Sequence, residues 1–157
     1  MAQPSRLIYR KPHLTSCSGK AKGCKKVDFG EFGLMCINGK GMTKDLQQRT
    51  GNWVTEKQIE AVRVVISKYC HLYSKQGAKM WIRIFPQLTV TKKPIGVRGG
   101  SGKGSPDRFV AVVKQGTVMF EVANIPESEA RECLRKAGAK LNVCTKVIKK
   151  GERGLYE

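Results

Sequence analysis

In the second half of the chain, two apolar segments rich in strand-forming residues are separated by so few residues that they strongly restrict the possible folds. Residues 109–114 and 117–122 are separated only by Gln115 and Gly116. A two-residue connection can join antiparallel strands, whereas parallel strands need a crossover of about a dozen residues or more. Glycine also suits the backbone conformations of tight hairpin turns. The two runs therefore predict a β-hairpin and, with it, an antiparallel sheet.

A helix is predicted immediately after Thr55. The side chains of Thr55 and Gln58 have the spacing of a capping box, in which each accepts a hydrogen bond from a backbone N–H at the start of the helix. Apolar residues then recur at helical spacing, at Ile59, Val62, Ile66, Tyr69 and Tyr73. Gly77 is a typical residue for the end of such a helix.

A second helix is predicted from Pro126, because the fixed φ of proline suits the first turn. Its buried stripe consists of Ala130, Cys133, Leu134, Ala137 and Leu141. Strands are also predicted at 33–37, 80–85, 88–91 and 143–148, with a turn at 38–41 and loops at 42–54 and 92–108. These elements predict an α+β fold, with two helices packed on one face of a mainly antiparallel sheet. We expect a basic N-terminal arm (1–27), an α+β domain (28–150) and a polar C-terminal tail (151–157).

The charge of the chain indicates a polyanionic partner. Lys and Arg total 30 against 12 Asp and Glu, which gives a formal net charge of +18. Such a charge destabilises a small compact domain by self-repulsion unless a polyanion neutralises it. Nucleic acid and an anionic membrane surface both meet that requirement. No apolar run approaches the ~18 residues of a membrane span, and no amphipathic helix with a basic polar face is apparent, so nucleic acid is favoured.

The N-terminal arm concentrates this charge. Up to Val27 it contains no acid and seven cations, namely Arg6, Arg10, Lys11, Lys20, Lys22, Lys25 and Lys26. A solvated, disordered tail is one interpretation of such a run, and contact with phosphates is the other. The absence of any acid favours phosphate contact. Tyr9 lies among these cations and could stack on a nucleotide.

The cysteines and histidines predict neither a metal site nor a disulfide framework. Six cysteines are present, but no CxxC occurs and neither histidine has zinc-ligand spacing to a cysteine pair. Four of the cysteines lie singly in apolar segments, where a free thiol behaves as a small hydrophobic group. The sequence therefore predicts a reducing compartment and no cofactor.

A loop dense in glycine and lysine, within residues 92–106, has three possible functions. It could be a flexible linker, the phosphate-binding loop of a nucleotide-handling enzyme, or an RNA-backbone contact. A P-loop should open a helix, and no helical pattern follows this segment. Asp107 is also the only acid near the loop, which leaves a metal-dependent enzyme without a carboxylate set. RNA contact is therefore favoured, since such loops reach into folded RNA. For Trp81 and Phe85, both core packing and base stacking remain open.

Matching motifs spread along residues 3–148 give the chain a specific resemblance. It resembles large-subunit ribosomal protein sixteen, the bacterial and organellar member of a universal ribosomal protein family. The residues that carry the resemblance are Gln3-Pro4, Arg6, Tyr9-Arg10-Lys11, Phe29-Gly30, Phe32-Gly33-Leu34, Thr55, Gln58-Ile59-Glu60-Ala61, Arg63, Lys79, Trp81-Ile82-Arg83-Ile84-Phe85-Pro86, Thr91, Lys93-Pro94, Val97-Arg98, Gly100, Gly102-Lys103-Gly104, Val110-Ala111-Val112-Val113, Gly116, Glu121, Pro126, Ala130 and Ala139-Lys140-Leu141.

The resemblance implies a non-enzymatic subunit of the large ribosomal particle. Its partners would be large-subunit rRNA, tRNA and neighbouring ribosomal proteins, and it would help to position aminoacyl-tRNA near the peptidyl-transferase centre. The resemblance places Arg6, Arg10, Lys11 and Lys20 in an rRNA-embedded terminus, and the charge pattern adds Tyr9, Lys22, Lys25 and Lys26. It also implies a loop that faces the tRNA acceptor end, formed by Arg98, Gly100, Gly102, Lys103 and Gly104.

Departures from the family pattern suggest which ribosome contains the chain. They are an extra segment between Gly41 and Thr55, a Gly99-Gly100 turn where Met-Gly is expected, a C-terminal extension and the cysteine count. Together they predict an organellar ribosome, with the mitochondrial one favoured over plastid or bacterial ones. Because the similarity begins at the first residues, we expect either an organelle-encoded gene or a mature form without its presequence.

Overall fold

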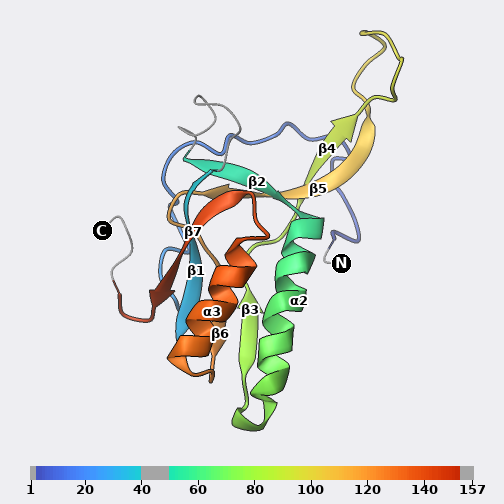
Figure 1. Cartoon of the computed structure of the whole chain (residues 1–157). Helices are drawn as coiled ribbons and strands as arrows, with labels where there is room; N and C mark the ends of the chain where they lie inside the picture. The colour runs from blue at the N-terminus through green and yellow to red at the C-terminus, as the bar shows by residue number, and fades with distance from the viewer. Residues whose placement is uncertain (1–2, 40–49, 153–157) are drawn as a thin grey trace.

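The computed structural model describes residues 3–39 and 50–152. The strands form two antiparallel sheets, a four-stranded one in the order β3-β6-β1-β7 and a three-stranded one in the order β2-β5-β4 (Figure 1). In chain order the elements are β1 (Phe32–Gly39), β2 (Gly51–Thr55), α2 (Glu56–Leu72), η1 (Ser74–Gln76), β3 (Lys79–Ile82), β4 (Leu88–Lys92), β5 (Ser105–Lys114), β6 (Val118–Ala123), α3 (Glu127–Gly138) and β7 (Val143–Lys149). This arrangement confirms the α+β class, with two sheets in place of the single one expected.

The first predicted helix, α2, begins as the sequence indicates. Gln58 N donates to the Thr55 hydroxyl at 3.4 Å, and Thr55 N donates to Gln58 Oε1 at 2.9 Å, so the capping box is confirmed. The helix ends at Leu72 rather than near Gly77. The short 3-10 turn η1 fills the interval, and Gly77 then adopts a φ of +72°. The glycine therefore ends the connection after the helix and not the helix itself.

The second predicted helix, α3, has the expected buried stripe. Its inward residues and the one that follows it are at most 4% exposed, namely Ala130, Cys133, Leu134, Ala137 and Leu141. The two helices pack against each other, α2 contacts β3, and α3 contacts β1 and β7, so both cover one face of the four-stranded sheet (Figure 1). The main core lies between the helices and the sheets, around residues such as Leu34, Ile66, Phe120 and Val122.

The predicted hairpin at Gln115-Gly116 is wrong. The chain does turn there, with Gly116 at a φ of +85°, but β5 and β6 belong to different sheets. Gly116 N donates to Cys36 O at 2.8 Å, and Cys36 N donates to Thr117 O at 2.9 Å. Because β1 takes these backbone bonds, the two runs separate after the turn. Every residue of β6 is buried, and β6 pairs with β1 and β3.

Three predicted boundaries also change. The strand expected at 80–85 ends at Ile82 as β3, and the loop expected at 92–108 is shortened because β5 begins at Ser105. The loop expected at 42–54 gives way to β2 from Gly51, while residues 42–49 lie outside the described residues. A Cβ at Gly51 would lie 2.2 Å from Val113 O, so glycine allows β2 to approach β5 closely. Of the turn expected at 38–41, Asn38 and Gly39 end β1, and the rest is not described.

The strands expected at 33–37, 88–91 and 143–148 are confirmed within β1, β4 and β7. In the described part of the chain, neither helix has the length and apolar character needed to cross a bilayer.

Candidate nucleic-acid interface

The described part of the N-terminal arm is attached to the body along its length. Residues 3–27 contain no helix and no named strand. Several bonds hold the arm to the β2-β5-β4 sheet and its flank. Ala21 N donates to Gln115 O at 2.8 Å, Trp53 Nε1 to Thr15 O at 3.1 Å, and Thr89 Oγ1 to Arg10 O at 2.9 Å. Figure 1 shows the arm passing around this sheet. The docked path argues against the interpretation of the arm as a freely solvated tail.

The side chains of the arm lie outward while its backbone is docked. All eight residues predicted to bind rRNA are exposed, namely Arg6, Tyr9, Arg10, Lys11, Lys20, Lys22, Lys25 and Lys26. The Tyr9 side chain is 76% exposed, which leaves its ring accessible for stacking. Between these side chains, Ala21 and Val27 are buried and help to fix the path of the backbone. The arm therefore presents a line of positive charge on a supported backbone.

The glycine- and lysine-rich loop, residues 93–104, extends from the β4–β5 end of the three-stranded sheet (Figure 1). Arg98, Gly100, Gly102 and Lys103 are exposed, whereas Gly104 is half-buried. Gly100 and Gly102 have φ values of +102° and +86°, which favour glycine, and a Cβ on either would meet no atom within 4 Å. The root is tighter, because a Cβ on Gly104 would lie 2.6 Å from Lys92 O. The loop therefore has an open tip above a closely packed root.

The loop leads into a strand, and this distinguishes the phosphate-binding loop of a nucleotide-handling enzyme from an RNA-backbone contact. A P-loop requires a helix whose N-terminal N–H groups bind the phosphates. Here the segment is followed by β5, so that site is not formed. Beside the root lies an open hollow of about 400 Å³ lined by Lys92, Lys93 and Asp107, among others. Within the described residues, no group of three or more His, Cys, Asp or Glu side chains is placed to hold a metal ion.

The arm and the loop, which are far apart in the sequence, meet at two lysines. Lys11 Nζ donates to Lys103 O at 2.8 Å. In return, Lys103 Nζ donates to Pro12 O at 2.8 Å and to Lys11 O at 3.4 Å. Within the loop, Lys93 Nζ donates to Gly100 O. The structure thus brings Lys11, predicted to bind rRNA, into contact with Lys103, predicted to face tRNA.

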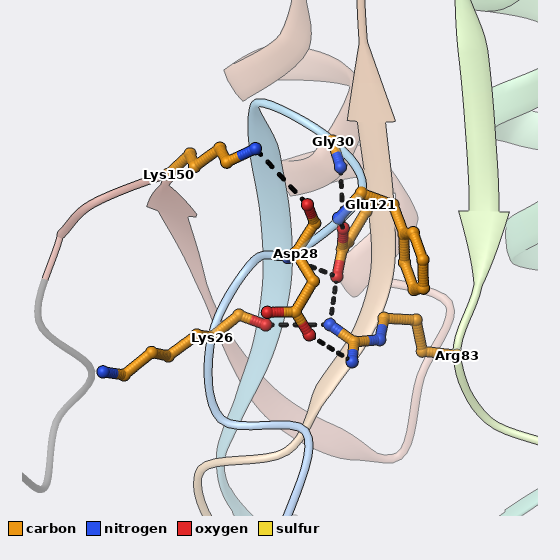
Figure 2. A network of polar contacts seen from close by, with 7 residues as sticks. Lys26, Asp28, Gly30, Arg83, Glu121 and Lys150 are labelled. Atoms are coloured by element: carbon orange, nitrogen blue, oxygen red, sulfur yellow. Dashed lines mark hydrogen bonds and ion pairs between the residues drawn. The ribbon is translucent and has the colours of Figure 1, made fainter.

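A buried carboxylate anchors the junction between the arm and the body (Figure 2). The Glu121 side chain on β6 is fully buried and accepts backbone N–H bonds from Phe29 and Gly30 at 2.8 Å and from Asp28 at 3.3 Å. Arg83 forms an ion pair with it. A buried charge is tolerated only where such bonds replace its hydration. Glu121 is therefore the polar centre of this junction.

Arg83 extends the same network toward the arm. It donates to Lys26 O at 2.8 Å and pairs with Asp28 at 2.6 Å (Figure 2). Desolvation lowers the pKa of Arg83, but hydrogen bonds to Glu121 and Asp28 outweigh it and raise the pKa above its ordinary value. Lys150 Nζ contributes a further bond to Asp28 O at 3.3 Å. These contacts bring Lys26, at the end of the arm, against the body of the protein.

The role of Glu121 was not predicted from the sequence, and the sequence left both core packing and base stacking open for Trp81 and Phe85. The available signal for Glu121 was a single acid inside the otherwise apolar run VMFEVA. Trp81 is stacked on Phe29, with ring centroids 6.3 Å apart, so the packing interpretation holds for that ring. Phe85 is half exposed and lies beyond the end of β3. Base stacking at Phe85 stays a prediction.

The helical layer differs from the arm in its electrostatics. Three of its acids pair with neighbouring cations on the same helix: Glu60 with Arg63 at 2.6 Å, Glu127 with Arg131 at 2.8 Å, and Glu132 with Lys136 at 2.6 Å. Hydrogen bonds from Lys149 and Arg131 lower the pKa of the Glu127 carboxyl. The arm up to Val27 contains no acid. The arm and the loop therefore carry a larger excess of positive charge than the helices do.

Comparison with known proteins adds an independent observation. A sequence model of the family described as "Ribosomal protein L16p/L10e" matches residues 4–148. The chain belongs to this family. The chain is similar to large ribosomal subunit protein uL16 of Malacoplasma penetrans, at 57% identity over 97% of each chain. The same protein of Ureaplasma urealyticum is 55% identical over 97% of this chain and 99% of its own, and that of Mycoplasmoides gallisepticum is 53% identical over 94% and 96%.

Membership of the family confirms the resemblance and corrects one expectation drawn from it. The family consists of ribosomal structural proteins and not of enzymes, so the chain is not a nucleotide-handling enzyme. The relatives are bacterial, and they do not support the expected mitochondrial ribosome. Relatives of nearly the same length exist in mycoplasmas, so the extra segment before Thr55 does not require an organelle. The departures from the family pattern therefore indicate sequence divergence and do not identify the compartment of the ribosome.

Proposed function

The chain is a structural protein of the large ribosomal subunit, and we propose that it binds large-subunit rRNA through the N-terminal arm, residues 1–27. The observation that carries the proposal is the arm itself, docked by its backbone and exposed at eight RNA-compatible side chains. Lysine and arginine on a fixed path can follow a phosphate backbone, and a docked backbone loses less entropy on binding than a free tail. In this proposal, the described residues between 28 and 150 form the body that supports the arm.

We further propose that the loop containing Arg98, Gly100, Gly102, Lys103 and Gly104 faces the acceptor end of aminoacyl-tRNA near the peptidyl-transferase centre. Three features support this assignment: the loop projects from the sheet, its tip is open, and its glycines leave backbone N–H groups accessible. The helical layer, with its paired charges, suits contact with neighbouring ribosomal proteins better than contact with RNA. Given the mycoplasma relatives, we propose that the ribosome is bacterial.

A charge-matched pair of variants tests the arm. Lys22 and Lys25 are exposed on the arm, and Lys57 and Lys68 are exposed on α2. Replacing Lys22 and Lys25 by Gln is expected to reduce the log–log salt slope for binding a large-subunit rRNA fragment by about 0.7 to 0.9 for each phosphate that the arm no longer neutralises. The same replacement of Lys57 and Lys68 removes equal charge and should leave the slope nearly unchanged. Equal reductions would mean that the arm is not the RNA-binding surface.

Arg98→Gln tests the loop. Arg98 is exposed near the tip, so its loss should not affect folding. A charge-assisted hydrogen bond is worth about 1.5 to 3 kcal/mol, so aminoacyl-tRNA affinity for the large subunit should fall about 10- to 100-fold. Binding of tRNA to large subunits reconstituted with each variant measures this effect. Arg108→Gln on β5, outside the loop, is the control, and normal tRNA affinity in the Arg98 variant would refute the loop assignment.

A further inference from the structure

The contact between Lys11 and Lys103 joins segments that are 92 residues apart in the sequence. Each ammonium group bonds carbonyl groups of the opposite segment: Lys11 Nζ to Lys103 O, and Lys103 Nζ to Pro12 O and Lys11 O. We call these three hydrogen bonds the arm–loop clasp. A lysine ammonium has three donors and no acceptor, so its bonds to these carbonyls use donors that a phosphate would otherwise occupy. Direct phosphate contact is therefore not the whole role of these two lysines.

The clasp has a firm base on the body of the protein. The carbonyl of Arg10, next to Lys11, accepts a bond from the Thr89 hydroxyl at 2.9 Å. Thr89 lies on β4 and is only 1% exposed, so it is fixed within the sheet. A continuous path then runs from β4 through residues 10–12 of the arm to Lys103. The arm thus gives the loop a second attachment at Lys103, one residue before Gly104 at its root.

The loop tip has little other support. At Gly96, Gly99, Gly100 and Gly102, the space that a Cβ would occupy has no atom within 4 Å. Glycine at positive φ is also the residue with the most backbone freedom to lose on ordering. Lys93 bonds Gly100 within the loop, which shapes the tip but does not tie it to the body. The clasp supplies the tie to the arm.

We propose that Lys11 and Lys103 are positioning residues: through the arm–loop clasp, the arm sets the orientation of the Gly/Lys loop. The clasp brings two cations together, and their repulsion opposes its closure in the free protein. Phosphates bound along the arm relieve that repulsion, so binding of rRNA to the arm orders the loop. The expected effect of the clasp on tRNA binding rests on the proposed function. The ordering of the loop by the clasp does not, because it follows from the three hydrogen bonds alone.

The test is ¹⁵N relaxation on the full chain, free and with an rRNA fragment. In the unmodified protein, the amides of Val97–Gly102 should become more ordered when RNA is added, toward order parameters of about 0.85. Lys11→Met keeps the approximate length of the side chain and removes its hydrogen-bond donor. The order parameters of these amides should then fall below about 0.6, both in the free protein and with RNA bound. Lys11→Arg should restore order, because a guanidinium can still donate to Lys103 O. Lys57→Met on α2, outside the arm and the loop, is the matched control and should behave as the unmodified protein.

A second measurement separates the clasp from the proposed function. If Lys11→Met leaves the loop amides as ordered as in the control, the clasp is refuted, whatever happens to tRNA binding. If Lys11→Met loosens the loop and lowers tRNA affinity while the control does neither, the clasp acts as proposed. The double variant Lys11→Met/Lys103→Met removes all three bonds of the clasp, so its loop amides should be at least as mobile as those of either single variant. Loop amides as ordered in the double variant as in the unmodified protein would overturn the proposal.

Discussion

Binding of the full chain to a large-subunit rRNA fragment is expected to weaken about a thousandfold to a hundred-thousandfold between about 50 and about 200 mM salt. That range applies to proteins that make about 6 to 10 phosphate contacts, because each contact releases condensed counterions. The arm contributes seven exposed cations and the loop contributes Arg98. Docking of the arm places these charges along one path, so a single RNA segment can meet many of them.

Filter binding or fluorescence anisotropy across a salt titration measures this dependence. The expected log–log plot is linear, with a slope that reports how many phosphates are neutralised. An unrelated RNA of equal length is the control: it should share the steep slope but bind more weakly, since phosphate contacts do not read sequence. A shallow slope with the rRNA fragment would contradict the proposed function, because the interface would then not be dominated by the arm.

Glu121→Gln is expected to lower the free energy of unfolding by about 3 to 5 kcal/mol, the usual effect of removing one partner of a buried ion pair. The substitution keeps the size of the side chain but removes the negative charge. Arg83, whose side chain is only 11% exposed, then loses the buried partner that offsets its desolvation. The glutamine amide has only one oxygen, and that oxygen can still accept hydrogen bonds from the backbone N–H groups of Phe29 and Gly30. Its NH₂ group is a donor and cannot replace the second carboxylate oxygen as an acceptor.

Urea denaturation of the full chain measures the loss of stability, and amide exchange locates it. The amides of Phe29 and Gly30 should exchange faster than those of α2, because the junction between arm and body opens first. Glu127→Gln makes the same chemical change at a half-exposed surface carboxylate that pairs with Arg131 and Lys149, and it should lower stability far less than Glu121→Gln. Similar effects from the two substitutions would show that Glu121 is not the anchor.

Local features of the structure could be predicted because short-range physics decides them. The capping box at Thr55 and Gln58 involves residues three apart, so its bonds form wherever the helix begins. The buried stripe of α3 follows from helical spacing alone. The exposed basic arm and the glycine loop were likewise evident, since charge resists burial and glycine permits open turns.

The partners of each strand could not be predicted in this way. β6 is buried on both faces, and a continuous apolar run does not reveal which strands flank it. At Gln115-Gly116, the backbone groups of Cys36 on β1 bond Gly116 and Thr117, and this pairing prevents β5 and β6 from forming a hairpin. A strand distant in sequence therefore takes the place that the hairpin partner was expected to occupy. The role of Glu121 was hidden for the same reason, because its partners lie at Phe29 and Gly30, just after the arm, and at Arg83, after β3.

By itself, the sequence determined the fold class, both helices, the basic arm, the glycine- and lysine-rich loop and the family. The tertiary structure decided which strands pair, how the chain divides into two sheets, and where the arm meets the loop at Lys11 and Lys103. The difference is physical: capping, helical spacing and charge depend on neighbours within a few residues. Strand pairing and the contact between arm and loop depend instead on residues brought together only by the folded core.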